Sequence, residues 1–207
     1  GSFAVQLCAT AGAHAIGVIS DESKRDYVMS LGAKGVINRK DFSCWGQLPK
    51  VNSAEFNDFM KEARKFGKAI WDITGKGIDP DIVFEHPGEA TFPVSCMVAK
   101  RGGMVVFCAG TSGFNITFDA RFVWMRQKRI QGSHFAHLKQ ASAANQLVIE
   151  RRIDPGLSEV FSWEDIPKAH MKMWKNEHLP GNMAVLVSAK HPGLRTYEDA
   201  IEAGNVA

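Results

Sequence analysis

The sequence has little of what marks membrane-embedded, secreted or nucleic-acid-binding proteins. Its longest apolar runs, such as 104–109 (MVVFCA), are far shorter than the roughly 20 residues that cross a bilayer. No segment has the charged, apolar and small-residue order of a signal peptide. A net charge of +3 over 207 residues gives no reason to expect nucleic acid as the main partner. We therefore predict a cytoplasmic protein with no membrane and no nucleic-acid partner.

Cysteine is also scarce, and the motifs of several enzyme classes are absent. The four cysteines are widely spaced: Cys8, Cys44, Cys96 and Cys108. Because they form no C-x-x-C pair, we expect reduced thiols rather than disulfides or a zinc site. The sequence contains no G-x-S-x-G elbow, P-loop or H-E-x-x-H. His134 and His137 suggest a metal, but no third ligand lies at a suitable spacing, so we expect none.

What the sequence does contain is an alternation of strand-length apolar runs and helix-length amphipathic segments. This alternation is typical of a doubly wound parallel sheet. The helix predicted at 1–13 has no strand before it, so the predicted class is α/β, a Rossmann-like sheet that lacks its first strand. Strands are predicted at 15–20, 35–38, 81–84, 103–109, 129–134 and 183–187. Further helices are predicted at 21–31, 54–75, 89–99, 120–127, 138–151 and within 161–178.

The alternation of predicted strands and helices is interrupted by one insertion and gives way to a different pattern near the C-terminal end. Residues 40–76 form an insertion, a loop followed by an amphipathic helix. A different rhythm starts after Asp154-Pro155-Gly156. We therefore predict a dinucleotide-binding domain at 1–155. The segment 156–207 is predicted to return to a separate catalytic domain and to end in a C-terminal tail.

Polar and basic residues follow the first two predicted strands. Ser20 ends one strand, Lys24 lies one helical turn later, and Arg39 ends the neighbouring strand. Such donors suit the 2′-phosphate of NADPH, whereas NADH requires a carboxylate at this place. Asp21 and Glu22 would repel a phosphate unless they point away. In the alternative interpretation, Ser20 is a helix N-cap and the two cations are solvated.

Three further groups lie where strands end or a helix begins. Gly1 and Ser2 suit the last glycine of a phosphate-binding turn before a helix, or they are a cloning remnant. The pairs Glu85-His86 and Cys108-Ala109 follow predicted strands, where ligands bind in open α/β sheets. Ordinary turn chemistry also explains the residues after each pair. His134 closes the next strand, although a lone histidine is more commonly structural.

Six stretches of the sequence resemble medium-chain reductases: GSFAVQLCATAGAHAIGVIS, SLGAKGVINR, DIVFEHPGEATF, KRGGMVVFCAGTSG, RFVWMRQKRIQGSHFA and GNMAVLVSA. The motifs FEHPG, CAGTSG and W-M-x-x-K-R-I-x-G-S-H-F, with RKFGK at 64–68, are more specific. Together they resemble the crotonyl-CoA carboxylase/reductases, zinc-independent members of the medium-chain superfamily, over nearly the whole chain. That resemblance implies a GroES-like half upstream, together with the first strand and most of its glycine turn.

The resemblance also implies an activity, a homotetramer and residue roles. NADPH would deliver a hydride to the β-carbon of crotonyl-CoA, and the α-carbon of the resulting enolate would attack carbon dioxide to give ethylmalonyl-CoA. His134 would help to hold carbon dioxide through a water molecule. The implied cofactor residues are Gly1, Ser2, Ser20, Lys24 and Arg39, with Glu85, His86, Cys108 and Ala109 at the nicotinamide. The implied CoA residues, near subunit interfaces, are Arg121 and Arg101.

Two other functions remain open at this point. An enoyl-CoA or quinone reductase without carboxylation would leave the G-S-H-F block unexplained. A non-catalytic nucleotide-binding fragment would account for a chain that holds most of a Rossmann domain and little chemistry. A doubly wound sheet does not choose among them, because the fold hosts many activities.

Overall fold

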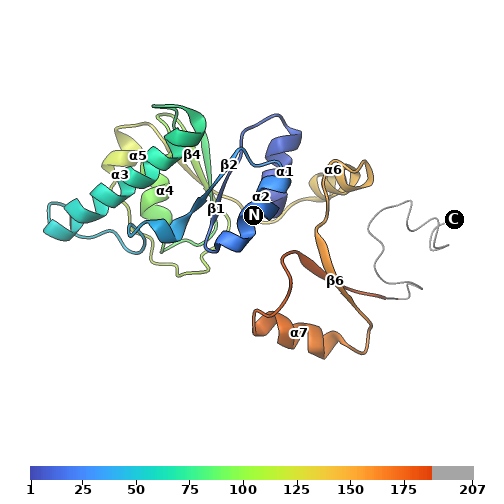
Figure 1. The fold of residues 1–207 in the computed structure, drawn as a ribbon. Helices are drawn as coiled ribbons and strands as arrows, with labels where there is room; N and C mark the ends of the chain where they lie inside the picture. Colours follow the sequence, from blue (N-terminus) through green and yellow to red (C-terminus); the bar gives the residue numbers. More distant parts are fainter. Residues whose placement is uncertain (188–207) are drawn as a thin grey trace. The chain divides into compact units, whose positions relative to one another are not determined.

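The computed structural model describes residues 1–187, and all strand pairs among them are parallel (Figure 1). The predicted tail at 188–207 lies outside the described residues. The chain divides into two compact units. We call the central unit residues Ile16–Asp26 and Lys34–Phe135. We call the terminal unit residues Gly1–Ala15, Tyr27–Ala33 and the described residues from Ala136 onward.

The central unit contains five strands, all close to their predicted positions. β1 (Ile16–Ile19) pairs with β2 (Gly35–Asn38). β4 (Met104–Phe107) lies between β3 (Ile82–Glu85) and β5 (Arg129–Gly132). Short apolar runs such as IGVI and MVVF account for the agreement, because they bury strand backbone between helices. The predicted α/β class with parallel strands is thereby confirmed.

The strands form two hydrogen-bonded sheets, where the sequence analysis predicts one. In dinucleotide-binding folds the usual order is 3-2-1-4-5-6, so the first strand lies between the second and the fourth. The observed orders β1-β2 and β3-β4-β5 fit that arrangement with the position between β1 and β3 open. Among residues 1–187 no strand pairs with both β1 and β3, and Val18, Ile82 and Phe84 on these two strands are exposed.

The helices of the central unit differ from prediction mainly at their ends. They are η1 (Glu22–Lys24), the first residues of α2 (Arg25–Ser30), η2 (Arg39–Asp41), α3 (Ala54–Thr74), α4 (Phe92–Val98) and α5 (Arg121–Trp124). The single helix predicted at 21–31 is a short 3-10 turn followed by α2. Asp21, not Ser20, is the N-cap of η1 and accepts a hydrogen bond from the N–H of Ser23 at 3.0 Å.

The predicted insertion folds as α3 and forms much of the core (Figure 1). Ser53 Oγ accepts the N–H of Phe56 at 3.1 Å and begins the helix, while Gly75 ends it with φ +108°. Its buried face packs against β2 and α4. The residues of that face are Phe56, Phe59, Met60, Ala63, Phe66 and Ile70. The insertion thus fixes the sheet whose ends carry the candidate site.

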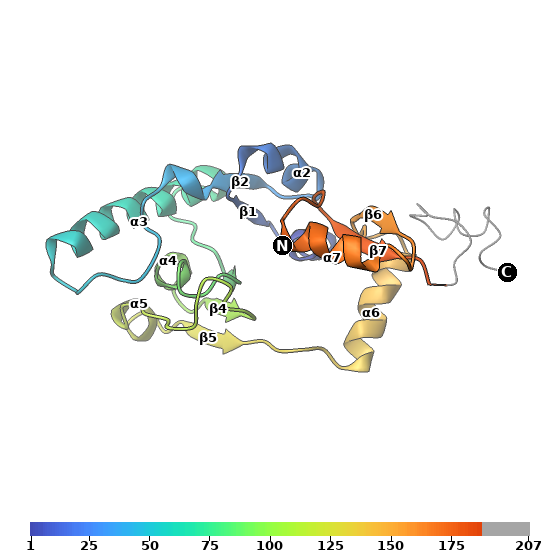
Figure 2. The same ribbon diagram turned by 90° about the horizontal axis from the view of Figure 1, so that it is seen from below.

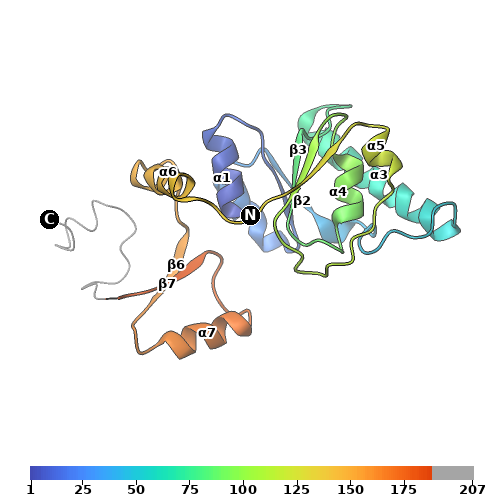
Figure 3. The ribbon, with the colours of Figure 1, turned by 180° about the vertical axis from the view of Figure 1, so that it is seen from behind.

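Helix α4 lies against the second sheet (Figure 3). Phe92, Cys96 and Ala99 pack with Val105 of β4 in a second buried cluster. Burial raises the pKa of the Cys96 thiol to about 12, and that of Cys44 to about 11. Both thiols are therefore protonated at neutral pH and contribute to packing.

The terminal unit combines both ends of the described chain. Its elements are α1 (Ser2–Thr10), the rest of α2, α6 (Leu138–Ile149), β6 (Leu157–Phe161), α7 (Ile166–Trp174) and β7 (Asn182–Val185). The Gln6 side chain donates to the carbonyl of Asp154 at 3.0 Å and accepts its N–H at 2.7 Å. These two bonds tie α1 to the segment after α6. The division into domains at 1–155 and 156–207 stays a prediction.

Strand β6 is absent from the sequence prediction. It pairs with β7 in a β-α-β arrangement with α7 between them. A register shift between Leu157 and Glu159 interrupts the alternation by which a half-buried strand is recognised. Over residues 1–187, no helix is both long and apolar enough to cross a membrane.

Candidate functional site

The first candidate cluster lies at the carboxyl ends of β1 and β2. Ile19 pairs with Asn38, so Ser20 and Arg39 leave the sheet side by side, and Lys24 follows at the end of η1. Lys24 is exposed, while Ser20 and Arg39 are half-buried. The predicted convergence of these strand ends is therefore present in the structure. Their role toward a 2′-phosphate stays a prediction.

Most of the negative charge near this cluster is already engaged. The Glu22 carboxylate pairs with Arg25 and accepts the Asn38 amide at 3.1 Å, and these hydrogen bonds lower the pKa of Glu22. The Asp21 carboxylate accepts the hydroxyl of Ser23 at 2.8 Å. The two acids are thus held by local partners, which leaves Lys24 and Arg39 available to an anion.

Lys40 is a residue of this cluster that the sequence analysis misses. Hydrogen bonds from Ser23, followed by the charges of Lys40 and Lys24, lower the pKa of the Asp21 carboxyl. Lys40 is exposed and directly follows Arg39. Its position in sequence is the signal that would have found it. The charges of Lys24 and Lys40 thus act on one hydrogen-bonded aspartate, and Arg39 lies beside Lys40 in the sequence.

The second candidate cluster lies at the carboxyl ends of β3, β4 and β5 (Figure 2). Glu85 pairs with Phe107, and Phe107 pairs with Gly132. The residues that follow this row therefore leave the same edge of the sheet: His86, Cys108-Ala109 and Ser133-His134. His86, Cys108 and His134 are exposed, and Ala109 is half-buried. The structure thus brings together at one edge the residues that the sequence analysis singles out.

The loops after β3 and β4 are fastened to one another largely by backbone. The carbonyl of Pro87 accepts the N–H of Ser112 at 2.8 Å and its hydroxyl at 2.7 Å. Gly88 has φ +84°, and a Cβ on it would lie 2.9 Å from both Gly110 Cα and Gly113 O. Glycine is therefore required at this contact. The two loops form one rigid edge.

The side chains of this edge differ in orientation. The Glu85 carboxylate is buried and bonded to the turn below it, so it does not project from the edge. The imidazole of His134 contacts the ring of Phe135 with ring centroids 3.8 Å apart and the ring planes inclined by 42°. Phe135 has φ +56°, which is strained for a bulky residue. His137, by contrast, caps α6 in a capping box with Gln140, an ordinary structural role.

A hollow of about 510 Å³ opens between α3, the turn before β4 and α5. Four arginines line it: Arg64, Arg101, Arg121 and Arg126. Its one acid is Asp119, which Arg121 holds in a forked contact at 2.7–3.1 Å. Hydrogen bonds from Arg121 lower the pKa of Asp119. Within residues 1–187 the salt bridges include none to the other three arginines, so the lining of the hollow carries an excess of positive charge.

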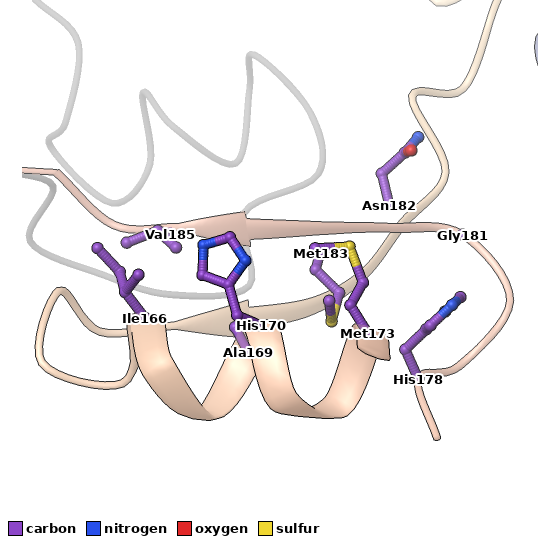
Figure 4. A pocket seen from close by; sticks show the side chains of 9 residues that line it. All are labelled: Ile166, Ala169, His170, Met173, His178, Gly181, Asn182, Met183 and Val185. Atoms are coloured by element: carbon purple, nitrogen blue, oxygen red, sulfur yellow. The ribbon is translucent and has the colours of Figure 1, made fainter. Parts of the chain in front are cut away.

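Two features lie in the terminal unit. Gly1 is the N-cap of α1 without a side-chain cap, and Ser2 is the first helical residue. A pocket of about 300 Å³ lies between α7 and β7, with His170, Met173 and Met183 in its wall (Figure 4). No charged residue lines this pocket. Over residues 1–187 its lining therefore contains no Arg or Lys, the residue types that bind phosphates by charge.

The family model described as zinc-binding dehydrogenase matches residues 1–150. The chain belongs to the zinc-binding dehydrogenase family. A crotonyl-CoA carboxylase/reductase of Cereibacter sphaeroides is 74% identical over 207 residues, which are 100% of this chain and 48% of that protein. The chain thus spans about half the length of this relative. The resemblance stated from the motifs is confirmed.

Solved structures of this dehydrogenase family agree. A crotonyl-CoA carboxylase/reductase matches with TM-score 0.92 and 80% identity over 98% of this chain and 47% of that chain. A 2-octenoyl-CoA carboxylase reductase, CinF, in complex with NADP and 2-octenoyl-CoA, matches with TM-score 0.81 and 33% identity. That match covers 99% of this chain and 44% of that one. The Rossmann-like fold class is thereby confirmed.

The family description implies zinc, and the donor set of this dehydrogenase chain does not fit it. Over residues 1–187, no group of three or more His, Cys, Asp or Glu side chains lies close enough to hold a metal ion. His137, the nearest histidine in sequence to His134, is occupied as a helix cap. A zinc site requires at least three such ligands. No step is therefore assigned to zinc.

Proposed function

We propose that the full-length protein containing this chain reductively carboxylates an α,β-unsaturated acyl-CoA, crotonyl-CoA, to ethylmalonyl-CoA with NADPH. The observation that supports this most is the register of β3, β4 and β5, which sends His86, Cys108 and His134 out of one sheet edge. The names of the relatives, which include carboxylase/reductases and an NADP and octenoyl-CoA complex, support the same reaction class.

The first cluster would hold the 2′-phosphate of NADPH. Ser20 offers a hydroxyl, and Lys24 and Arg39 offer charge, on neighbouring strand ends whose acids are engaged elsewhere. His86, Cys108 and Ala109 would border the nicotinamide, while Gly1 and Ser2 would face the pyrophosphate at the start of α1. When bound, NADPH supplies the hydride that reduces the β-carbon.

His134, also in the second cluster, is proposed to act at the α-carbon of the substrate. Hydride addition to the β-carbon moves charge to the thioester oxygen and makes the α-carbon nucleophilic, and a new carbon–carbon bond to carbon dioxide then completes the product. Because a proton competes for the same carbon, carbon dioxide must be held there and water excluded. His134, which leaves the same edge as His86, is proposed to hold carbon dioxide through a water molecule.

The arginine-lined hollow is proposed to receive the phosphates of CoA. Arg121 and Arg101 are the residues that the sequence resemblance implies, and the geometry adds Arg64 and Arg126 to them. Guanidinium groups bind phosphate oxygens by paired hydrogen bonds. A homotetramer and a cytoplasmic location are proposed on the resemblance alone, and sedimentation of the full-length protein would test the tetramer.

The decisive experiment is the mass of the product from crotonyl-CoA and NADPH, made by the full-length protein with and without bicarbonate. We expect a product heavier than butyryl-CoA by one carbon dioxide, formed only with bicarbonate. Butyryl-CoA under both conditions would instead mean an enoyl-CoA reductase without carboxylation. NADPH binding without any acyl-CoA turnover would mean a non-catalytic nucleotide-binding protein.

The role of His134 is tested separately by His134→Asn. The side chain is exposed, so the substitution disturbs no packing beyond its tilted contact with the ring of Phe135. We expect the product to shift toward butyryl-CoA while the dissociation constant for NADPH stays unchanged. An unchanged product ratio would remove His134 from the carbon dioxide site.

A further inference from the structure

Glu85 ends β3 with its carboxylate buried under the turn that follows. The residue is 2% exposed. Its Oε1 accepts the N–H of Gly88 at 3.0 Å and the hydroxyl of Thr91 at 2.6 Å, and its Oε2 accepts the hydroxyl of Ser95. All three donors belong to the turn or to the start of α4. The carboxylate therefore faces protein groups and not the open edge of the sheet.

The same turn is fixed from its other side by the loop after β4. Ser112 donates twice to the carbonyl of Pro87, and the N–H of Glu89 donates to the carbonyl of Gly113 at 3.3 Å. His86 lies between these bonds and Glu85, and over residues 1–187 its own side chain makes no hydrogen bond. The backbone of the turn consequently decides where the imidazole of His86 lies.

Helix α4 is held at its far end by a charge of the opposite sign. The Lys128 ammonium, 8% exposed, donates to the carbonyls of Cys96 at 2.7 Å and Met97 at 3.0 Å. An acid at the start of a helix and a base at its end both complement the helix dipole. Lys128 directly precedes β5. Helix α4 is thus hydrogen-bonded at its start to the end of β3, which precedes His86, and at its end to the residue before β5, which precedes His134.

We infer that Glu85 is a positioning residue, which fixes the His86–Gly88 turn and the first turns of α4 and does not contact the cofactor. This role differs from the one that the resemblance implies, in which Glu85 lines the nicotinamide. It rests on the proposed function only in assuming that the turn borders the nicotinamide of NADPH. The hydrogen bonds themselves do not depend on that function.

A positioning role requires acceptors at this place and does not require the negative charge. In a Glu85→Gln variant, the amide oxygen accepts from Gly88 and Thr91, and the amide N–H₂ donates to Ser95 Oγ. The Ser95 hydroxyl then turns to the carbonyl of Thr91, four residues earlier, as helical serines commonly do. Glu85→Ala, by contrast, leaves the Gly88 N–H and the Thr91 hydroxyl without an acceptor.

Two measurements on the full-length protein separate these cases. The first is hydrogen exchange of the Gly88 amide, which reports on the turn without any ligand. The second is the dissociation constant for NADPH, from nicotinamide fluorescence, which needs no acyl-CoA. Kinetics with crotonyl-CoA then give kcat and KM. Val94→Ala, in the buried face of α4 and clear of the turn, is the control for a general loss of stability.

We expect Glu85→Gln to keep the Gly88 amide protected from exchange and to bind NADPH within about threefold of wild type. The dependence of kcat on pH should be unchanged. Glu85→Ala should lose protection at Gly88 and bind NADPH about tenfold more weakly or worse. Val94→Ala should lower the midpoint of thermal unfolding but leave NADPH affinity unchanged. Thr91→Val removes one donor without leaving it unpaired, and it should show an intermediate effect if Glu85→Ala does not fold.

Two results would overturn the inference. The first is a Glu85→Gln variant as impaired as Glu85→Ala with an altered pH profile, because that would assign the carboxylate charge a direct contact. The second is a Gly88 amide that stays protected in Glu85→Ala or in Thr91→Val. A wild-type protein that makes no carboxylated product, with the expected exchange pattern in the variants, would end the proposed function and leave the positioning role standing.

Discussion

The two groups of strand ends in the central unit are built by different means. At β1 and β2 the candidate groups are polar side chains on the surface, Ser20, Lys24 and Arg39, next to acids held by local partners. At β3 and β4 the edge is made by backbone hydrogen bonds and one buried carboxylate. The first arrangement can lose a side chain and keep its fold. In the second arrangement, a change in the backbone conformation would destabilise the fold.

This contrast makes Gly88→Ala the substitution with the largest expected effect. The φ of +84° and the contacts of a new Cβ at 2.9 Å with Gly110 and Gly113 together should cost about 3 kcal/mol of unfolding free energy. Urea denaturation of the full-length protein measures it. Gly67→Ala in α3, where a Cβ meets nothing within 4 Å, should instead stabilise by up to about 1 kcal/mol. Equal stabilities for the two variants would contradict the description of the edge.

The second prediction concerns the exposed end. The double change Lys24→Ala and Arg39→Ala removes two cations from neighbouring strand ends, and Lys24 is also close enough for its charge to lower the pKa of Asp21. We expect KM for NADPH to rise about 10- to 100-fold, with KM for NADH unchanged and the unfolding midpoint kept. Lys68→Ala, an exposed lysine on α3, is the control. An equal rise for both cofactors would mean that these residues do not distinguish the 2′-phosphate.

The arginine-lined hollow should lose substrate affinity as the exposed end does, but Arg121→Ala should also lower the unfolding midpoint, because it leaves the buried Asp119 carboxylate unpaired. With both Arg121→Ala and Arg101→Ala, KM for crotonyl-CoA should rise about tenfold, because charge-assisted hydrogen bonds to phosphate are lost. KM for crotonyl-pantetheine, which lacks the nucleotide phosphates, should not change. A matching rise for the truncated substrate would place the CoA phosphates elsewhere.

Lys128 should show the smallest effect and behave like the buried edge. Burial lowers its pKa from 10.5 to about 8. Between those values the unfolded chain binds more protons than the folded one, so the free energy of unfolding contributed by Lys128 rises with pH across this window. Below about pH 8 the full cost of burying the charge is present. The unfolding midpoint of wild type should therefore rise relative to that of Lys128→Met as the pH increases from about 8 to 10.5.

Local sequence was sufficient to place the elements and most candidate residues. Apolar runs located β1 to β5 within a few residues, and the amphipathic pattern at 54–75 located α3, because periodicity is a local property. The neighbouring strand ends followed from parallel pairing alone. Motif resemblance, which depends on identity and not on geometry, supplied the family.

The sequence did not predict side-chain orientations or which residues far apart in the chain become neighbours. The strand that ends at Glu85 was predicted one residue short, and no pattern shows that its carboxylate turns inward to Gly88, Thr91 and Ser95. The sequence analysis assigns no role to Arg126 and uses Arg64 only as part of a motif, whereas in the structure both line one hollow with Arg101 and Arg121. Strand β6 was hidden by a shift in register.

By itself the sequence determined the α/β class, the order of elements, the family and the residues at each strand end. These follow from side-chain periodicity and residue identity, which act over a few positions. Only the tertiary structure decided which residues share an edge, which carboxylates face the protein and which arginines share a hollow. Those outcomes depend on packing between segments tens of residues apart, where burial and hydrogen bonding, not local pattern, select one arrangement.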